Sequence, residues 1–233
     1  MGAQVLLQQG SGPEGSRQSI ARGLVAGVTR SLRGGMDVVR LETDRLILDA
    51  PTERDIPFIY AYCQDPLIQQ FTTVPQPYAL SDAEGFLSRV VKPGWSSGKE
   101  LTWAVRLKAE PTILGVVSLR DWNDTQAMVG FWLGAPWRGR GYMPEAVRAV
   151  ADWVFSGQWD IPGRASNKSI LWEAMVGNAG SALVAQRTGF RYVGTGRSEI
   201  ERFGEFPPSH RAELTPADLP GPAGGWPAEA FQR

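Results

Sequence analysis

The segment from Trp137 to Ala146 carries residue types that hold phosphate groups, in the order WRGRGYMPEA. It lies between a strand-like apolar run and a stretch with helical apolar spacing, so we expect it at a strand-to-helix junction. A helix N-terminus offers unpaired backbone N–H groups and the positive end of the helix dipole, and both attract phosphate oxygens. Glycines let the backbone approach a ligand closely, and arginines add positive charge. The residues expected to bind a polyphosphate are Arg138, Gly139, Arg140, Gly141, Tyr142 and Met143.

Other phosphate-binding loops fit this segment less well. A P-loop requires Gly-Lys-Ser/Thr after its glycines, whereas this chain has Gly141-Tyr142-Met143. A dinucleotide-binding fingerprint needs a third glycine at position 144, which is proline, and it belongs near the start of a parallel fold. An ordinary helix start with solvated arginines is the alternative that this segment alone leaves open.

The surrounding chain alternates between strand-like and helix-like patterns. Strand character is expected over 38–41 and on through 45–48, and over 102–107, 113–119, 128–133, 169–176, 190–194 and 210–214. Helices are expected over 53–70, from a capping box at 81–84 through Val91, over 142–155, and over 178–188 with a stop at Gly189. The expected fold class is α/β (α+β): a single domain with a mixed, mainly antiparallel sheet of about seven strands flanked by helices.

The composition limits the classes of partner and chemistry. Lys plus Arg and Asp plus Glu both number 24, so the zero net charge gives no electrostatic case for nucleic acid as a partner. Cys63 is the only cysteine and His210 the only histidine, so we expect no internal disulfide and no metal site. No apolar run has transmembrane length, so we expect no membrane partner. A single thiol suits a reducing compartment, and the expected location is cytoplasmic.

Both ends of the chain differ from its centre. Residues 1–35 are rich in Gly, Ser, Gln and Arg, with Glu14 as the only acid. We interpret them as a disordered extension or as translation begun upstream of Met36, with an Arg-rich transit peptide as the alternative. Residues 216–233 are rich in Pro, Gly and Ala and are expected to form a loose tail. The predicted domain therefore spans residues 36–215.

Several segments resemble, in the correct order, the GNAT superfamily of N-acetyltransferases and its RimJ/RimL-like branch. Arg138-x-x-Gly141-x-Met143 resembles the acyl-CoA loop of that family. The segment 130–133 resembles its fourth strand, which splays from the fifth and pairs with the pantetheine arm. The segments 41–48, 172–181 and 186–194 resemble the opening strand, the fifth strand with its following helix, and the closing segment. The resemblance covers residues 39–215, and it departs from the family pattern at Met143, normally a small residue, and at Pro144, which lacks an N–H.

The resemblance implies an acyl-CoA-dependent N-acyltransferase that works by direct transfer. The donor would be acetyl-CoA or another short acyl-CoA, with no metal, and the acceptor a primary amine of a protein N-terminus or of a small molecule. It implies that Asn178 contacts the pantetheine arm and that Ser181 lies near the sulfur as a hydrogen-bond donor. Backbone N–H groups around Trp132 and Leu133 would polarise the thioester carbonyl. The assembly would be a monomer or a homodimer.

A catalytically silent acyl-CoA-binding sensor or interaction module is the alternative function. Many relatives carry an acid near the start of the fourth strand, where this chain has Met128-Val129. A CoA-release assay with an acyl-CoA and a panel of amines separates the two.

The general base of the expected reaction is the least defined part of the site. Glu173 is the nearest candidate by sequence, on the opposite strand face from its neighbours Trp172 and Ala174. Asp121, just after the strand 113–119, is the second candidate. Trp95, Trp103 and Trp122 are candidates for lining an acceptor cleft, although tryptophan is more often a core residue. His210 is expected to be structural.

Overall fold

The structure is a computed structural model that describes residues 27–28, 38–120, 125–157, 169–202, 204–218 and 220–232 of the chain. Apart from 27–28, whose backbone alone is described, the expected N-terminal extension lies outside these residues. Asp121 and Trp122 lie outside them too. None of the helices in the described ranges has the length and apolar character that crossing a bilayer requires.

One sheet runs through the molecule, and it places its strands in the order β1-β2-β3-β4-β5-β6-β7-β9-β8. All neighbours pair antiparallel except β6 and β7, which are parallel. The expected mixed, mainly antiparallel sheet is thus confirmed. In the described residues it has nine strands rather than about seven, because 39–49 forms a hairpin of two strands and Gly27–Val28 adds a short edge strand. The strands are β1 (Gly27–Val28), β2 (Val39–Glu42), β3 (Leu46–Asp49), β4 (Leu101–Leu107), β5 (Glu110–Arg120), β6 (Gln126–Leu133), β7 (Ser169–Met175), β8 (Arg191–Arg197) and β9 (Pro208–Leu214).

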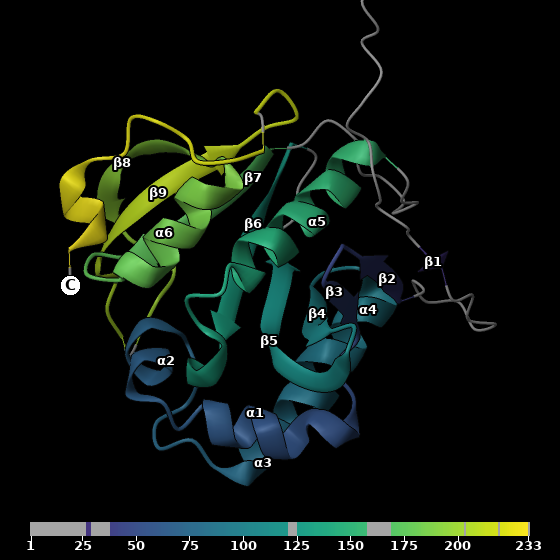
Figure 1. Ribbon diagram of the computed structural model, residues 1–233. Helices are drawn as coiled ribbons and strands as arrows, with labels where there is room; N and C mark the ends of the chain where they lie inside the picture. The colour runs from purple at the N-terminus through teal and green to yellow at the C-terminus, as the bar shows by residue number, and fades with distance from the viewer. Residues whose placement is uncertain are drawn as a thin grey trace, which may run out of the picture.

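Helices cover both faces of this sheet. Figure 1 shows α5 and α6 lying across the sheet, with α1, α2 and α3 grouped at one end of the view. The helical segments are η1 (Glu53–Asp55), α1 (Ile56–Tyr62), α2 (Pro66–Phe71), α3 (Leu80–Gly85), the π-helical η2 (Phe86–Val91), α4 (Lys92–Ser97), η3 (Ala135–Trp137), α5 (Tyr142–Ser156), α6 (Ala179–Thr188) and η4 (Ala228–Phe231). The predicted helices 142–155 and 178–188 are confirmed, and Gly189 ends the second.

The expected single helix over 53–70 is interrupted. Asp65 has an extended backbone, as a residue before proline prefers, and Pro66 begins a new helix. The Asp65 carboxylate accepts hydrogen bonds from the N–H groups of Leu67 (2.8 Å) and Ile68 (3.3 Å), so it caps α2. The predicted capping box at 81–84 was also displaced: α3 begins at Leu80, and its cap is the Asp82 carboxylate, which accepts from the N–H of Ala79 at 2.8 Å.

Alternation along the strands divides the core between the two faces. The larger cluster packs α5 and α6 against one face and contains the fully buried Trp103, Trp153 and Trp172. The smaller cluster lies under α1 and α3 on the other face. It includes Ile59 and Ile113, both at most 1% exposed.

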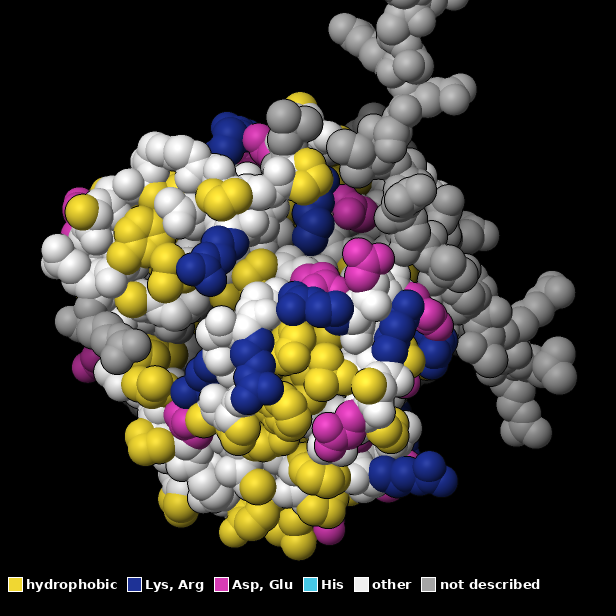
Figure 2. Space-filling view, viewed as in Figure 1, with side chains coloured by type: hydrophobic (Ala, Val, Ile, Leu, Met, Phe, Trp, Pro, Cys, Tyr) yellow, Lys and Arg dark blue, Asp and Glu magenta, His cyan; other side chains and the backbone are white. Residues whose placement is uncertain are grey.

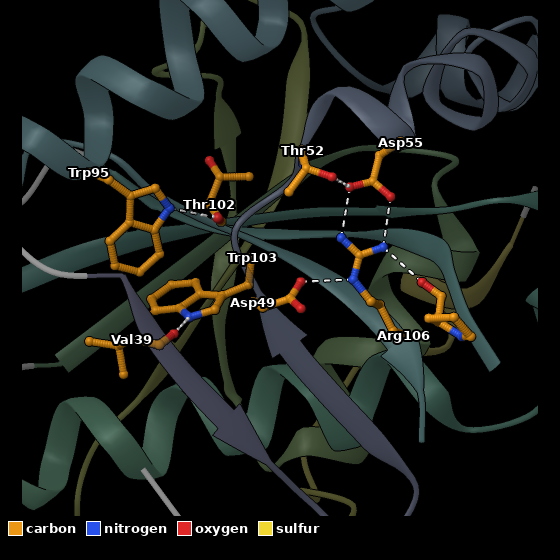
Figure 3. Close-up of polar contacts among 9 residues, drawn as sticks. Val39, Asp49, Thr52, Asp55, Trp95, Thr102, Trp103 and Arg106 are labelled. Carbon is orange, nitrogen blue, oxygen red and sulfur yellow. Dashed lines mark hydrogen bonds and ion pairs between the residues drawn. The ribbon is translucent and has the colours of Figure 1, made fainter. Parts of the chain in front are cut away.

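Arg106 on β4 joins three segments through a buried ion-pair cluster (Figure 3). Its guanidinium donates two hydrogen bonds of 2.7 Å to the carboxylate of Asp55 and one of 2.8 Å to Asp49. Burial alone would raise the pKa of Asp55, but the hydrogen bonds from Arg106 and Thr52 outweigh it and the pKa is lowered. The cluster fixes the start of α1 against β3 and β4.

Residues 220–232 pack against the domain, although their composition led us to expect a loose tail. The indole N–H of Trp226 donates to the carbonyl of Phe190 at 2.8 Å, and Ala230 is 1% exposed within the larger core cluster. Figure 1 shows the C-terminal turn η4 beside α6 and β8. The composition of the segment is dominated by Pro, Gly and Ala and gives no sign that one tryptophan packs against the domain. The burial of a single indole can nevertheless hold a short segment in place.

Candidate active site

The site is built around an opening in the sheet between β6 and β7. The two strands pair over only four residues of each, and the last pair is Val129 with Trp172. Beyond it, β6 continues to Leu133 on β5 and β7 continues to Met175 on β9. The backbone groups on the facing edges of both strands are therefore released from the ladder, as the family resemblance implied.

The register of β5 and β6 determines which peptide groups face the opening. The N–H of Gly134 donates to the carbonyl of Leu114 at 2.9 Å, so hydrogen-bonded pairs recur at every second residue and include Trp132 with Val116. The peptide groups of Phe131 and Leu133 therefore point toward the opening, and that of Trp132 points toward β5. Of the N–H groups expected around Trp132 and Leu133, this register therefore leaves those of Leu133 and Phe131 facing the opening.

A cleft of about 490 Å³ lies at this opening. Its walls come from the sheet, from the α2–α3 connection, from η2 and from the β8–β9 connection. Four of the predicted site residues line it, namely Trp132, Glu173, Asn178 and Ser181. Leu133 and the loop residues 138–143 are not among its lining residues, so the loop and the cleft form two separate parts of the site.

Ser181 is held from two sides at the start of α6. Its backbone N–H donates to the side-chain oxygen of Asn178 at 3.2 Å, so Asn178 is the N-cap of the helix. Its hydroxyl oxygen accepts a hydrogen bond of 3.0 Å from the indole N–H of Trp172. An indole N–H is only a donor, so the hydroxyl proton of Ser181 must point elsewhere. Within the described part of the chain that proton has no acceptor, and Ser181 lines the cleft.

Glu173 reaches the cleft with a carboxylate that already has partners. Its side chain is 2% exposed and forms an ion pair of 3.1 Å with Arg211 on β9. It also accepts hydrogen bonds from the hydroxyl of Ser198 and from the backbone N–H of Glu199 at 3.2 Å. To take a proton from an amine, the carboxylate would have to release one of these donors. The sequence placed Glu173 on the strand correctly, but its partners lie 25 or more residues away along the chain.

The loop before α5 has the backbone geometry of an anion site. Gly139 and Gly141 have φ values of 77° and 76°, a region that side chains with a Cβ rarely adopt, and Gly141 is the N-cap of α5. Among the described residues no hydrogen-bond partner is found for five consecutive N–H groups, those of Gly139, Arg140, Gly141, Tyr142 and Met143. Figure 2 shows Lys and Arg side chains gathered over the segment between β6 and α5.

The side chains of this loop have more structural roles than the sequence indicated. Arg138 donates to the carbonyl of Leu133 at 2.9 Å and to Asp65 at 3.2 Å, so it ties the loop to β6 and to α2. Met143 is 3% exposed in the core, which leaves only its N–H for a ligand. Arg140 is exposed and lies 5.5 Å from the ring of Trp137, where it remains accessible to an anion.

Arg45, which the sequence analysis missed, holds the other side of the loop. It forms an ion pair of 2.6 Å with Glu145 in the first turn of α5 and donates to the carbonyl of Arg140 at 3.2 Å. Its guanidinium also lies 4.8 Å from the ring centre of Tyr142. Arg45 and Glu145 are 100 positions apart, so the local sequence gives no sign of their ion pair. The ion pair follows from the packing of α5 against β3 in the folded chain.

The remaining candidates are placed away from the chemistry. Trp95 and Trp103 are core residues whose indole N–H groups donate to the carbonyls of Thr102 and Val39, and neither lines the cleft (Figure 3). Burial raises the pKa of the Cys63 thiol to about 12, so this cysteine is not a nucleophile at neutral pH. No group of three or more His, Cys, Asp or Glu side chains suited to a metal ion is found in the described residues.

Comparison with known proteins agrees with this arrangement. A family model described as Acetyltransferase (GNAT) domain matches residues 45–191, which is more than half of the 233-residue chain. No curated protein matches the sequence. Several solved structures share its fold.

The ribosomal-protein-S5-alanine acetyltransferase from Vibrio fischeri is 20% identical, with a TM-score of 0.62 over 77% of this chain and 98% of that chain. The ribosomal L7/L12 alpha-N-protein acetyltransferase RimL, in complex with coenzyme A, is 18% identical, with a TM-score of 0.61 over 74% and 95%. The microcin C7 self-immunity acetyltransferase MccE, in complex with acetyl-CoA and AMP, is 20% identical, with a TM-score of 0.62 over 74% and 93%. At these identities the likeness extends to the fold.

Proposed function

The chain belongs to the GNAT acetyltransferase family and is an acyl-CoA-dependent N-acetyltransferase, and we propose that it transfers the acyl group directly to a primary amine of a protein N-terminus or of a small molecule. The observation that carries the proposal is the opening between β6 and β7. The hydroxyl of Ser181 lines the cleft at this opening, and the free N–H groups of the loop before α5 follow shortly after the end of β6 in the chain.

The donor would be held by backbone groups more than by side chains. The five free N–H groups from Gly139 to Met143 suit the pyrophosphate of CoA, and the exposed Arg140 adds charge. The peptide group of Phe131 and the N–H of Leu133 suit the pantetheine arm, which would take the place of a paired strand, whereas the carbonyl of Leu133 already accepts from Arg138. In this arrangement the N–H of Leu133 or Phe131 is available to the thioester oxygen.

The reaction would proceed without a covalent enzyme intermediate. The amine nitrogen attacks the thioester carbon, a C–N bond forms, and the carbonyl oxygen gains negative charge that a backbone N–H stabilises. The C–S bond then breaks, and the sulfur takes the hydroxyl proton of Ser181. The oxygen of Ser181 regains a proton from the nitrogen through water, so the net change moves one proton from nitrogen to sulfur.

For the proton of the incoming amine, Glu173 is the candidate base in the cleft. A lysine amine has a pKa of about 10.4 and an α-amine of about 8, so either is partly or largely protonated at neutral pH. Glu173 would accept the proton after releasing one of its present donors, and water in the cleft is the alternative route.

The acceptor is proposed from the size of the cleft and from the relatives. A volume of about 490 Å³ suits a small molecule or the first residues of a peptide. Two of the similar structures are named as acetyltransferases of ribosomal proteins, and the third is a self-immunity enzyme solved with AMP. We further propose a cytoplasmic location, which suits the single reduced thiol, and a monomer or homodimer.

The experiment that tests the function measures CoA release from acetyl-CoA in the presence of an amine panel. The panel contains peptides with N-terminal Ser or Ala, free lysine, and small aminated nucleosides. Release of CoA that depends on an amine, with the acetylated amine found by mass spectrometry, supports the proposal. Tight binding of acetyl-CoA without turnover of any amine would favour the silent acyl-CoA sensor instead.

The role of Ser181 makes a specific prediction. Ser181→Ala should lower kcat by roughly 10- to 1000-fold, by analogy with the loss of one oxyanion-hole donor, while KM for acetyl-CoA changes little. The leaving sulfur is charged only late in the reaction, so the donor acts mainly on the transition state. Ser88→Ala is the matched control, because Ser88 is a helical serine outside the cleft. A wild-type kcat in Ser181→Ala would remove Ser181 from the mechanism.

A further inference from the structure

Trp172 lies at the point where the sheet opens, and two contacts fix its ring. It belongs to the last pair that joins β7 to β6, and its side chain is 2% exposed. On one side its indole N–H reaches the hydroxyl oxygen of Ser181 at 3.0 Å. On the other side its ring packs against that of Trp226, with 5.5 Å between the ring centres. The position of the Ser181 hydroxyl is therefore coupled to the C-terminal segment through one indole.

The C-terminal segment, residues 220–232, is anchored well enough to act as a support. The ring of Trp226 also contacts Tyr192 on β8 at 5.3 Å and Phe231 at 5.8 Å. Its N–H donates to the carbonyl of Phe190 at 2.8 Å, and the N–H of Ala223 donates to the carbonyl of Gln186 at 2.9 Å. These contacts hold the segment on β8 and on the end of α6, the helix that carries Ser181.

We propose that the C-terminal segment positions the Ser181 hydroxyl for catalysis, with Trp226 and Trp172 as positioning residues. Trp226 holds the ring of Trp172, and the indole N–H of Trp172 occupies one lone pair of the Ser181 oxygen. That hydrogen bond leaves the hydroxyl proton free for the leaving sulfur and prevents it from turning toward the helix backbone. The segment lies outside the family match at residues 45–191, so the family alone does not supply this role.

The inference rests on the proposed role of Ser181 as the proton donor. If it is right, Trp226→Leu and Trp172→Phe each lower kcat, by roughly 5- to 50-fold, with KM for acetyl-CoA within about twofold of the wild type. Trp172→Phe keeps an aromatic ring, although a smaller one, on the side of Trp226 and removes the N–H. Trp226→Leu keeps apolar volume and removes the flat ring. The acceptor in these measurements is whichever amine of the panel reacts fastest.

A double-mutant cycle separates positioning from general destabilisation. Because both tryptophans would act through one hydroxyl, combining either change with Ser181→Ala should cost no more kcat than Ser181→Ala alone. The matched control is Trp103→Phe, which also removes a buried indole N–H, here from the carbonyl of Val39. Trp103→Phe should lower the melting temperature and leave kcat unchanged.

A spectroscopic measurement makes the test independent of any acceptor. The indole N–H signal of Trp172, identified by its loss in Trp172→Phe, should shift in Ser181→Ala and in Trp226→Leu. The more conservative Trp226→Tyr should restore most of the signal position and most of kcat if Trp226→Leu is too unstable to study.

The outcomes distinguish this inference from the proposed function. If the wild type releases no CoA with any amine, the proposed function fails. Suppose instead that the wild type releases CoA and that Ser181→Ala lowers kcat. If both tryptophan variants then keep the wild-type kcat, and the indole N–H signal of Trp172 does not shift in Trp226→Leu, this inference alone is overturned. Additive losses in the double mutants would also overturn it.

Discussion

A substitution at Gly141 tests whether the loop before α5 binds phosphate. Its φ of 76° and its place at the N-cap of α5 mean that Gly141→Asp adds both a strained Cβ and a negative charge where phosphate would approach. We expect this variant to fold and to show no CoA binding in calorimetric titration. Gly98→Asp is the matched control, because Gly98 ends α4 with a φ of 66°. Equal affinity in Gly141→Asp and the wild type would rule out the loop as the phosphate site.

The carboxylate of Glu173 is the candidate general base. If it accepts the proton of the amine, Glu173→Gln should lower kcat by roughly 100- to 10,000-fold, because an amide cannot accept that proton. The measurement is kcat with acetyl-CoA in excess. A wild-type kcat in Glu173→Gln would remove Glu173 as the base, and the ion pair with Arg211 would then be its whole role.

Among the elements, the start of α1 depends on the buried cluster of Arg106, Asp55 and Asp49. Arg106→Gln should lower the free energy of unfolding by about 3–5 kcal/mol, because it leaves the carboxylate of Asp55 buried and uncompensated. The midpoint of urea unfolding measures this. Lys92→Gln is the control, since it breaks the exposed pair of Lys92 with Glu53 in the same η1 turn and should leave the midpoint unchanged.

The sign of the acid dependence follows from the lowered pKa of Asp55. A carboxylate whose pKa is lower in the folded state contributes stability above its unfolded pKa, and that stability is lost as the pH falls through the folded value. The Arg106→Gln variant should therefore lose less stability than the wild type when the pH is lowered below 4. A parallel loss in both proteins would contradict the assignment.

Sequence reasoning worked best for elements whose signals are local. The helix of α5 and the stop of α6 at Gly189 follow from apolar spacing and from one glycine, and both are observed. The break at Asp65-Pro66 could also have been predicted, since proline and its preceding residue disfavour a continuous helix, but the apolar spacing favoured a single helix. Contacts between residues far apart in the chain could not be predicted from local patterns. The partners of Glu173 come from the β8–β9 connection and from β9, and the support for Trp172 comes from Trp226, 54 positions away.

For the whole molecule, the single histidine gives a pH dependence that one residue controls. Burial lowers the pKa of His210 below its ordinary value of 6.5, and Glu229 opposes this only in part. The unfolded chain then binds a proton more readily than the folded one as the pH falls below about 6.5. We expect the free energy of unfolding to be level near pH 7.5 and to fall toward pH 5.5.

The histidine prediction has a direct control. His210→Gln should remove the slope between pH 7.5 and 5.5 in urea unfolding, because no other side chain of ordinary pKa titrates in that range. A slope unchanged in His210→Gln would mean that a carboxylate with a strongly raised pKa is responsible. The Nδ1 atom of His210 lies within 3.1 Å of the hydroxyls of Tyr192 and Thr195, so the size of the effect also reports that polar network.

The ladder between β6 and β7 joins two unequal parts of the sheet. Among the described residues, six strands lie on one side of it and three on the other, and four residue pairs join the two sides directly. Beyond Val129 and Trp172 the two strands are held only by their outer neighbours, β5 and β9. A thioester lying between the strands at this point would add contacts between the two parts of the sheet and oppose their local separation. Donor binding and the rigidity of the sheet would then depend on the same backbone groups.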